Sequence, residues 1–358
     1  TDASNTTAQV LKQGEVQGSD VAAHSAGVLD IKTTILPDAD ALFLTAIDRY
    51  GHELWRWTFP VNKLNQANEV LSPLSNKVTS TETENELTVK AKNHTFIFSK
   101  KDGQLKGVSV NNRKISFANG PRFIGARRAD RSLDQFYNHD DEKAKEKDRT
   151  YSEFPDAAVF TKLDVKEDGG NLIVTADYKL GNLDKVQWTI NPNGEAVLDY
   201  TYNFSGVVDL MGICFDYPED QVISKRWLGA GPYRVWQNRI HGTQYDVWEN
   251  DYNDPIPGET FTYPEFKGYF GSVSWMNIRT KEGTISLTNE TPDAYIGVYQ
   301  PRDGRDRLLY TLPESGISVL NVIPPVRNKV NSTDLCGPSS QPKWVNGPQS
   351  GRIIFRFM

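Results

Sequence analysis

Residues 227–275 carry the side chains in this chain that are best suited to hold a sugar. Twelve of these forty-nine residues are Phe, Trp or Tyr, against an aromatic share of 11% for the whole chain. Aromatic rings offer flat apolar faces to the C–H faces of a pyranose, while carboxylates and guanidinium groups bind its hydroxyls. Such polar groups are interleaved with the rings: Arg239, His241, Asp246, Glu249, Asp251, Asp254, Glu259 and Glu265. The segment therefore predicts a carbohydrate-contacting surface.

Seven residues are our candidate substrate contacts: Trp236, Arg239, His241, Trp248, Glu249, Asp130 and Glu265. The guanidinium of Arg239 would donate paired hydrogen bonds to hydroxyl or carboxylate oxygens, and the two Trp rings would stack on the sugar. Residues Trp227, Leu228 and Tyr233 suit packing beneath the loop. No residue is assigned a catalytic role, because glycoside hydrolysis needs two carboxyl groups about 5 to 10 Å apart and a sequence gives no such distance.

Glycine and proline recur through the same segment, at positions 229, 231, 232, 242, 255, 257, 258 and 264. These residues favour turns and divide the segment into stretches too short for ordinary strands, so we expect loops here. Loops often carry recognition groups. An all-β protein also fills a wide core with Trp and Tyr, so core packing is an equal alternative for any single ring.

Composition and motifs exclude several other classes of protein. A net charge of -6 and a pI near 5.5 argue against a nucleic-acid partner, which needs a positive field. The two cysteines, Cys214 and Cys336, and five widely spaced histidines show no metal-ligand spacing. Phosphate-binding glycine loops and Gly-x-Ser-x-Gly elbows are missing, and no apolar run approaches the ~18 residues of a membrane span. We expect a soluble globular protein without a cofactor or metal.

Alternation of apolar and polar residues with a period of two runs through most of the chain and predicts strands. In the larger part these cover residues 86–92, 95–99, 105–110, 159–165, 171–178, 186–190, 196–204, 284–288, 295–299, 308–311, 317–322 and 352–357. Short turns such as residues 101–103 and 192–194 join neighbouring strands, as in hairpins. The predicted fold class is therefore all-β with antiparallel sheets.

The chain divides by composition into two parts. Residues 63–79 are polar, lose the alternation and are interpreted as a linker. Residues 1–62 hold four expected strands, at 9–16, 28–33, 41–48 and 53–59, about half of an immunoglobulin-like sandwich. Residues 80–358 are long enough for two broad sheets stacked face to face.

One family matches these motifs. The run Trp-Leu-Gly-Ala-Gly-Pro at 227–232, then Arg239, Thr-Tyr-Pro-Glu at 262–265 and Gly268, resembles the C-terminal domain of the large bacterial β-galactosidases of glycoside hydrolase family two. Residues 96–130, with Gly-Pro-Arg-Phe and Arg-Arg-Ala-Asp, are similar to the first strands of that domain. Residues 27–57 are similar to the end of the immunoglobulin-like domain that precedes it.

The resemblance implies a galactose-mutarotase-like antiparallel supersandwich preceded by a partial immunoglobulin-like β-sandwich. It also implies that hydrolysis of a terminal β-linked galactose or related sugar occurs on a TIM barrel outside this chain, leaving a non-catalytic, carbohydrate-contacting portion. The expected partners are the sugar and that barrel, and oligomerisation is left open. Magnesium or sodium sites of the family are expected mainly outside this chain, and the expected location is periplasmic or extracellular. Family members often place a Trp near the C-terminus, whereas residues 334–338 read Asp-Leu-Cys-Gly-Pro here.

Two other functions stay open. An autonomous aldose mutarotase or polysaccharide lyase on the same fold would need an acid/base pair, for which His241 or His139 with Glu249 or Glu265 are the candidates. A stand-alone glycan-binding or purely structural module needs no such pair.

Overall fold

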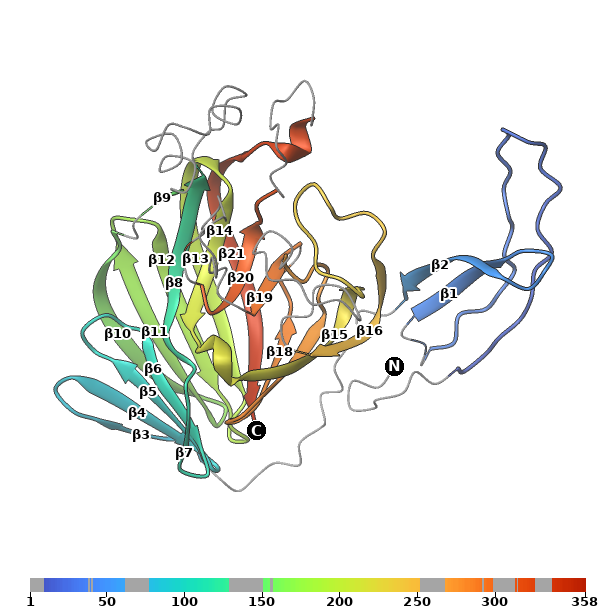
Figure 1. The fold of residues 1–358 in the computed structure, drawn as a ribbon. Helices are drawn as coiled ribbons and strands as arrows, with labels where there is room; N and C mark the ends of the chain where they lie inside the picture. Colours follow the sequence, from blue (N-terminus) through green and yellow to red (C-terminus); the bar gives the residue numbers. More distant parts are fainter. Residues whose placement is uncertain are drawn as a thin grey trace. The chain divides into compact units, whose positions relative to one another are not determined.

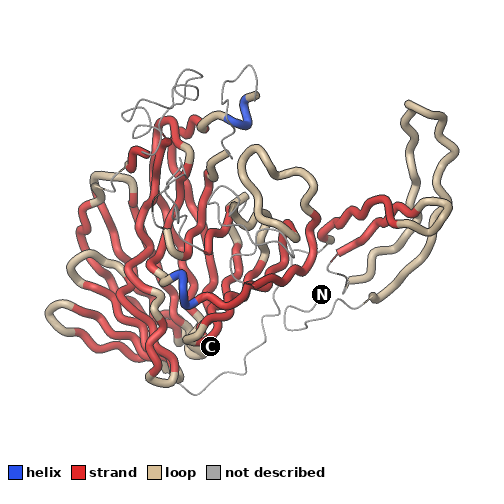
Figure 2. Tube along the Cα trace, viewed as in Figure 1, coloured by secondary structure: helices blue, strands red, loops and turns tan. Residues whose placement is uncertain are grey.

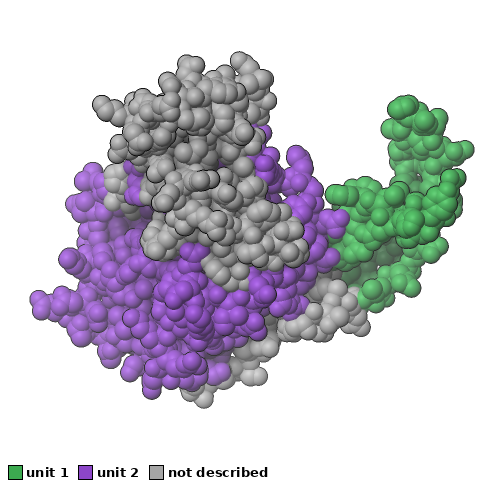
Figure 3. Space-filling view, viewed as in Figure 1, with its two compact units in different colours: residues 1–72 green, residues 73–358 purple. Residues whose placement is uncertain are grey.

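The computed structural model, shown in Figure 1, describes residues 10–37, 39, 41–61, 77–128, 151–154, 157–251, 268–291, 293–298, 313, 315–325 and 337–358. Figure 3 distinguishes two compact units, residues 1–72 and residues 73–358. Regular structure in the described residues consists of strands and two short 3-10 helices, η1 (Glu219–Gln221) and η3 (Pro338–Ser340), as Figure 2 shows. Over these same ranges, no helix has the length and apolar character needed to span a membrane.

In the first unit, strand β1 (Ala41–Ile47) pairs antiparallel with β2 (Glu53–Pro60). The turn between them is fixed by Asp48, whose carboxylate accepts hydrogen bonds from the backbone N–H groups of Tyr50 and His52, both at 2.8 Å. The backbone bond from His52 is the main cause that lowers the pKa of the Asp48 carboxyl, and the bonds from the His52 ring and the Tyr50 backbone add to it. The structure therefore contains the strands expected at 41–48 and 53–59.

The prediction of two further strands in this unit, at 9–16 and 28–33, is wrong. Residues 10–37 form no strand, and Val28 is 89% exposed. Alternation produces a strand only where a neighbouring strand bonds the backbone and a core covers one face. The described residues offer these segments neither, so the hairpin of β1 and β2 is the regular structure in the described part of the unit. The immunoglobulin-like sandwich stays a prediction.

The second unit is built on two antiparallel sheets. The first sheet has nine strands, with the C-terminal strand in the middle. Their order is β10 (Val159–Asp168), β11 (Asn171–Lys179), β12 (Leu183–Ile190), β13 (Ala196–Val208), β21 (Lys343–Phe357), β18 (Gly283–Asn289), β17 (Trp275–Thr280), β15 (Val222–Gly231) and β16 (Gln244–Asp251).

The second sheet has ten strands. Its main path is β19 (Tyr295–Val298), β20 (Ile317–Val322), β14 (Leu210–Asp216), β8 (Ala118–Arg128), β6 (Leu105–Val110), β5 (His94–Ser99), β4 (Glu86–Ala91) and β3 (Thr79–Glu82), while β7 (Arg113–Ile115) pairs with β6 and β9 (Tyr151–Glu153) with β8. The two expected broad antiparallel sheets are thus confirmed.

One core fills the space between the two sheets. Along β13, Leu198, Tyr200 and Tyr202 are buried in this core, while Asp199 and Thr201 between them lie on the opposite face. Successive side chains of a strand point to opposite faces, so every central strand contributes alternate residues to the core. Outer faces of the sheets are therefore where polar side chains can be displayed.

The strands predicted in residues 80–358 are present, and most of their ends are shifted by a few residues. The last strand, β21, begins at Lys343, well before the predicted start at residue 352, and the strand predicted at 308–311 lies outside the described part. The strands that the sequence did not predict include β14 to β17. Three of these, β15 to β17, fall in or at the edge of the aromatic segment, which is where the candidate site begins.

Candidate functional site

The expectation that residues 227–275 form loops is wrong for three stretches. Strand β15 continues to Gly231, β16 follows it, and β17 begins at Trp275. The glycines here permit close approach rather than turns: a Cβ on Gly231 would lie 2.4 Å from the ring of Trp248, and one on Gly229 would lie 3.0 Å from the backbone of residues 271 and 273. Glycine in a strand interior often marks such a contact.

The base of the segment is packed as predicted. Trp227 and Leu228 are buried. The indole N–H of Trp227 donates to the carbonyl oxygen of Ala230 at 3.0 Å, and the ring meets Phe270 edge-on at 4.8 Å. The hydroxyl of Tyr233 donates to the carbonyl oxygen of Gly242 at 2.8 Å, which closes the loop above them.

Trp236 lies in the interior and not on a sugar-facing surface. Beyond Gly231 the chain crosses onto the outer face of the ten-stranded sheet, where Val235 and Tyr269 exchange backbone hydrogen bonds at 2.7 and 2.8 Å. Trp236 is 4% exposed and meets the ring of Tyr269 at 5.7 Å. Its cluster also contains Ile124, Ala126, Leu210, Cys214, Leu320 and Ile323. The predicted stacking of Trp236 on a ligand is corrected, because the side chain is buried in this cluster.

Arg239 and His241 are candidate contacts that face solvent, two residues apart in the loop between β15 and β16. The backbone N–H of Arg239 donates to the carbonyl oxygen of Trp236 at 2.8 Å. Both side chains are exposed. The buried Trp236 therefore anchors the turn that presents them.

Trp248 and Glu249 are neighbours on β16 and point to opposite faces. Trp248 is opposite Trp227, packs partly against the core, and donates its indole N–H to the carbonyl oxygens of Gly229 and Gln244 at 3.2 and 3.1 Å. Glu249 is exposed. Because consecutive strand residues face opposite ways, one small ligand cannot contact both side chains.

Asp130 and Glu265 lie outside the described residues. Of the seven candidates, the structure thus leaves Arg239 and His241 exposed on the same loop, buries Trp236, and points Trp248 and Glu249 to opposite faces of β16.

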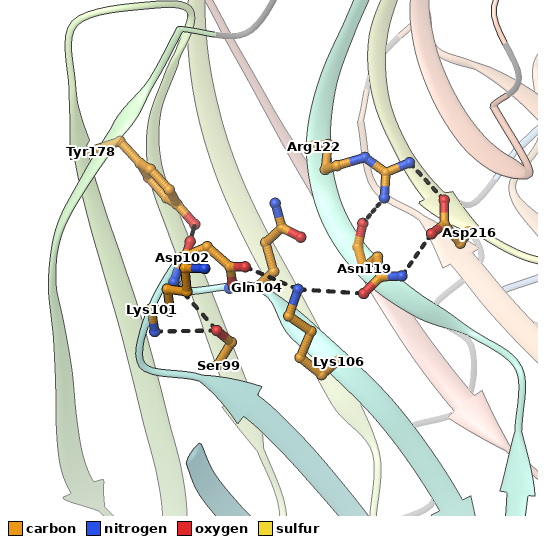
Figure 4. A network of polar contacts seen from close by, with 9 residues as sticks. All are labelled: Ser99, Lys101, Asp102, Gln104, Lys106, Asn119, Arg122, Tyr178 and Asp216. Carbon is orange, nitrogen blue, oxygen red and sulfur yellow. Dashed lines mark hydrogen bonds and ion pairs between the residues drawn. The ribbon is translucent and has the colours of Figure 1, made fainter. Parts of the chain in front are cut away.

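A network that the sequence did not predict surrounds Arg122 (Figure 4). One terminal nitrogen of Arg122 donates to Asp216 Oδ1 at 2.7 Å, and the other donates to the carbonyl oxygen of Asn119. The Asn119 amide donates to Asp216 Oδ2 at 2.7 Å, and its Oδ1 accepts a bond of 3.5 Å from Lys106, which pairs with Asp102 at 2.9 Å. In the sequence Arg122 stood out only as part of the Gly-Pro-Arg-Phe motif. Nothing in the sequence pointed to Asp216 as its partner, because the two residues meet only when β8 pairs with β14.

The interactions of this network stabilise the charged forms of Arg122 and Asp102. Burial opposes the charge of Arg122, but its interactions with Cys214 and Asp216 outweigh burial and raise the pKa of the guanidinium. Burial likewise opposes ionisation of Asp102, yet hydrogen bonds from Lys106 and from the backbone of Gln104 leave its pKa lowered. Both groups stay ionised at neutral pH, which suits a clamp between strands better than proton transfer.

Cys214 is expected to be inert in the folded protein. Burial raises the pKa of its thiol to about 11, so near pH 8 only about one thiol in a thousand is ionised. In a Cys336→Ser background we expect no reaction of the native protein with a chromogenic disulfide reagent, and reaction of one thiol after unfolding. Stoichiometric labelling of the native protein within minutes would contradict this burial.

The described ranges hold no group of three or more His, Cys, Asp or Glu side chains that could hold a metal ion.

Comparisons with known proteins place the chain in a family. The model of the β-galactosidase small chain family matches residues 90–323, more than half of the chain. A search of curated proteins found no match. Among solved structures, galactose 1-epimerase of Lactobacillus acidophilus NCFM is 9% identical, with a TM-score of 0.44 and coverage of 79% of this chain and 99% of that one. An aldose epimerase homologue of C. elegans is 8% identical, with a TM-score of 0.36 and coverage of 78% and 99%. By the family match, this chain belongs to the β-galactosidase small chain family.

Proposed function

We propose that this chain is the non-catalytic, carbohydrate-contacting part of a β-galactosidase-like glycoside hydrolase. The observation that carries the proposal is the match of residues 90–323 to the β-galactosidase small chain. The parent enzyme would hydrolyse a terminal β-linked galactose or a related sugar, and its reacting carboxyl groups would lie on a separate catalytic barrel.

The geometry of the aromatic segment supports contact rather than reaction. Arg239 and His241 stand on an exposed turn, while Trp227 and Trp236 beneath them are locked in packing. Exposed polar groups on a loop can meet the hydroxyls of a sugar that is held elsewhere, because the buried aromatic residues fix the base of the loop.

Complementation tests the proposal. We expect the chain alone to leave an aryl β-galactoside intact, and to restore hydrolysis when added to a β-galactosidase catalytic portion from which the small-chain domain has been deleted. Robust hydrolysis by the chain alone, or failure to restore any activity in trans, would contradict it.

The contact residue can be tested in the same assay. Loss of a charge-assisted hydrogen bond in Arg239→Ala should lower kcat/KM of the restored activity about tenfold. Arg279→Ala is the matched control. It removes an arginine that is also exposed but lies on β17, away from the loop of Arg239, and it should leave kcat/KM unchanged. Equal loss in both variants would remove Arg239 from the contact surface.

The autonomous mutarotase is the alternative that remains to be tested. Two of its candidate residues, His139 and Glu265, lie outside the described residues, and His241 and Glu249 are exposed on separate elements. Polarimetry of freshly dissolved galactose should show the same rate of anomerisation with and without the chain. An acceleration that is lost in His241→Ala would favour the mutarotase.

A further inference from the structure

The outer face of the nine-stranded sheet contains a cavity of about 370 Å³ that is open to solvent and is formed by β12, β13, β21 and the residues after β18. This volume lies within the range of about 300 to 1,000 Å³ typical of small-molecule sites. Its polar wall includes Lys185, Gln187, Asp199, Thr201, Glu290 and Arg352. None of the candidate contacts in the aromatic segment lines it.

Strand register creates this polar wall. Gln187 on β12 is opposite Asp199 on β13, which is in turn opposite Arg352 on β21. Lys185 and Thr201 form the next row. Directly opposed side chains on one face lie about 5 Å apart, so the two rows make a continuous polar floor.

The charges on this wall are balanced and held in place. Arg352 Nη1 donates to both carboxylate oxygens of Asp199, at 2.9 and 3.0 Å, and Arg352 Nε lies 3.1 Å from Glu290 Oε2. All three side chains keep between a third and a half of their surface exposed. With Lys185 the wall carries two positive and two negative groups. Arg352 is already paired with both carboxylates, so an anion gains less on this wall than a neutral ligand rich in hydroxyls, which can use donors and acceptors alike.

The far wall is fixed by the backbone of β21. The N–H of Glu290 donates to the carbonyl oxygen of Arg352 at 2.9 Å, and the hydroxyl of Thr291 accepts from the N–H of Arg352 at 2.9 Å. A Cβ on Gly351 would lie 2.2 Å from the hydroxyl oxygen of Tyr200 and 2.7 Å from that of Thr291. Glycine is therefore required at this position for β21 to approach Tyr200 and Thr291 so closely. The cavity is therefore built into the fold.

We propose that this cavity binds an uncharged hexopyranose unit of a saccharide. Asp199 and Glu290 accept hydrogen bonds from its hydroxyls, and Lys185, Gln187 and Arg352 donate to them. The Thr201 hydroxyl, on the same wall, can both donate and accept. The guanidinium lies between the two carboxylates, so they do not face each other across a glycosidic bond and the site binds without reacting. This function goes beyond the contact made by Arg239 and does not depend on a catalytic partner.

Calorimetric titration of the full chain with D-galactose, lactose and D-galacturonate tests the proposal. We expect saturable binding of a neutral sugar with a Kd on the order of 1 mM, since no aromatic face is offered for stacking. Binding of galacturonate should be at least tenfold weaker. Asp199→Asn and Thr201→Ala should each weaken binding of the neutral sugar at least tenfold, while Arg239→Ala should bind as the unchanged protein does.

Thr189→Ala is the matched control. Thr189 lies on β12, on the same face of the same sheet and two residues from Gln187, but does not line the cavity. It should leave the affinity unchanged. Thr201→Ala keeps the ion pairs of Arg352, so it decides the result if Asp199→Asn fails to fold.

Two results would overturn the site: no saturable binding of either neutral sugar at tens of millimolar, or unchanged affinity in both Asp199→Asn and Thr201→Ala. Tenfold weakening in Thr189→Ala would also count against it, because the effect would then be general to the sheet. The titration contains no catalytic portion, so its failure leaves the complementation result standing, and failure of complementation leaves the titration standing.

Discussion

Phe355→Ala should lower the free energy of unfolding of the second unit by about 3 to 5 kcal/mol, the usual cost of emptying a buried phenylalanine site. Phe355 on β21 is 0% exposed. Its ring centroid lies 5.1 Å from that of Phe117, 5.6 Å from Phe215 and 6.0 Å from Trp188. Phe215 belongs to the ten-stranded sheet and Trp188 to the nine-stranded one, so the cavity would open where the two sheets meet.

Urea denaturation followed by near-ultraviolet circular dichroism measures this change. Trp344→Ala is the control: it removes a larger ring from the same strand, but Trp344 is 71% exposed. Its effect should stay within about 0.5 kcal/mol. A loss below about 1 kcal/mol for Phe355→Ala, or an equal loss in the control, would show that this ring cluster is not the junction of the sheets.

Trp236→Ala should lower the free energy of unfolding by a similar amount, about 3 to 5 kcal/mol. The side chain is almost fully buried against Tyr269 on the outer face of the ten-stranded sheet, so its removal leaves a cavity beneath the exposed turn. The measurement also separates scaffold from binding surface, because a ring that stacks on a sugar contributes to affinity and not to folding.

Arg239→Ala is the partner experiment, since Arg239 is exposed on the turn that Trp236 anchors. Its unfolding free energy should change by no more than about 0.5 kcal/mol. The burial of Trp236 would be refuted by the opposite pattern: a Trp236→Ala protein of unchanged stability that no longer supports sugar hydrolysis in the complementation assay.

Period-two alternation predicted most of the strands of the second unit, but not β14 to β17, some of which also pack on the core. In β4, Leu87, Val89 and Ala91 alternate with polar residues and are buried, as the pattern requires. The same alternation at residues 28–33 formed no strand, because the described residues provide neither a pairing partner nor a core there. Alternation thus predicts which face a strand would bury, and a neighbour decides whether the strand exists.

The glycines of residues 227–232 show why the aromatic segment was misread. As sequence letters, Gly229 and Gly231 look like turn residues. In the fold they belong to β15, where the ring of Trp248 and the backbone of residues 271–273 leave little room for a Cβ. Close packing between distant segments has no local signal, so a glycine required by it cannot be distinguished from one required by a turn.

Sequence alone determined that this protein is all-β and antiparallel, and it pointed to Arg239 and His241 as polar groups near aromatic rings. Tertiary structure alone decided that Trp236 is scaffold, that Arg122 meets Asp216, and that Gln187, Asp199 and Arg352 line one cavity. The physical reason is the distance along the chain over which each effect acts. Alternation and turn propensity act over a few residues, whereas the last strand, β21, enters the middle of its sheet and brings Arg352 to Asp199 across 153 positions of chain.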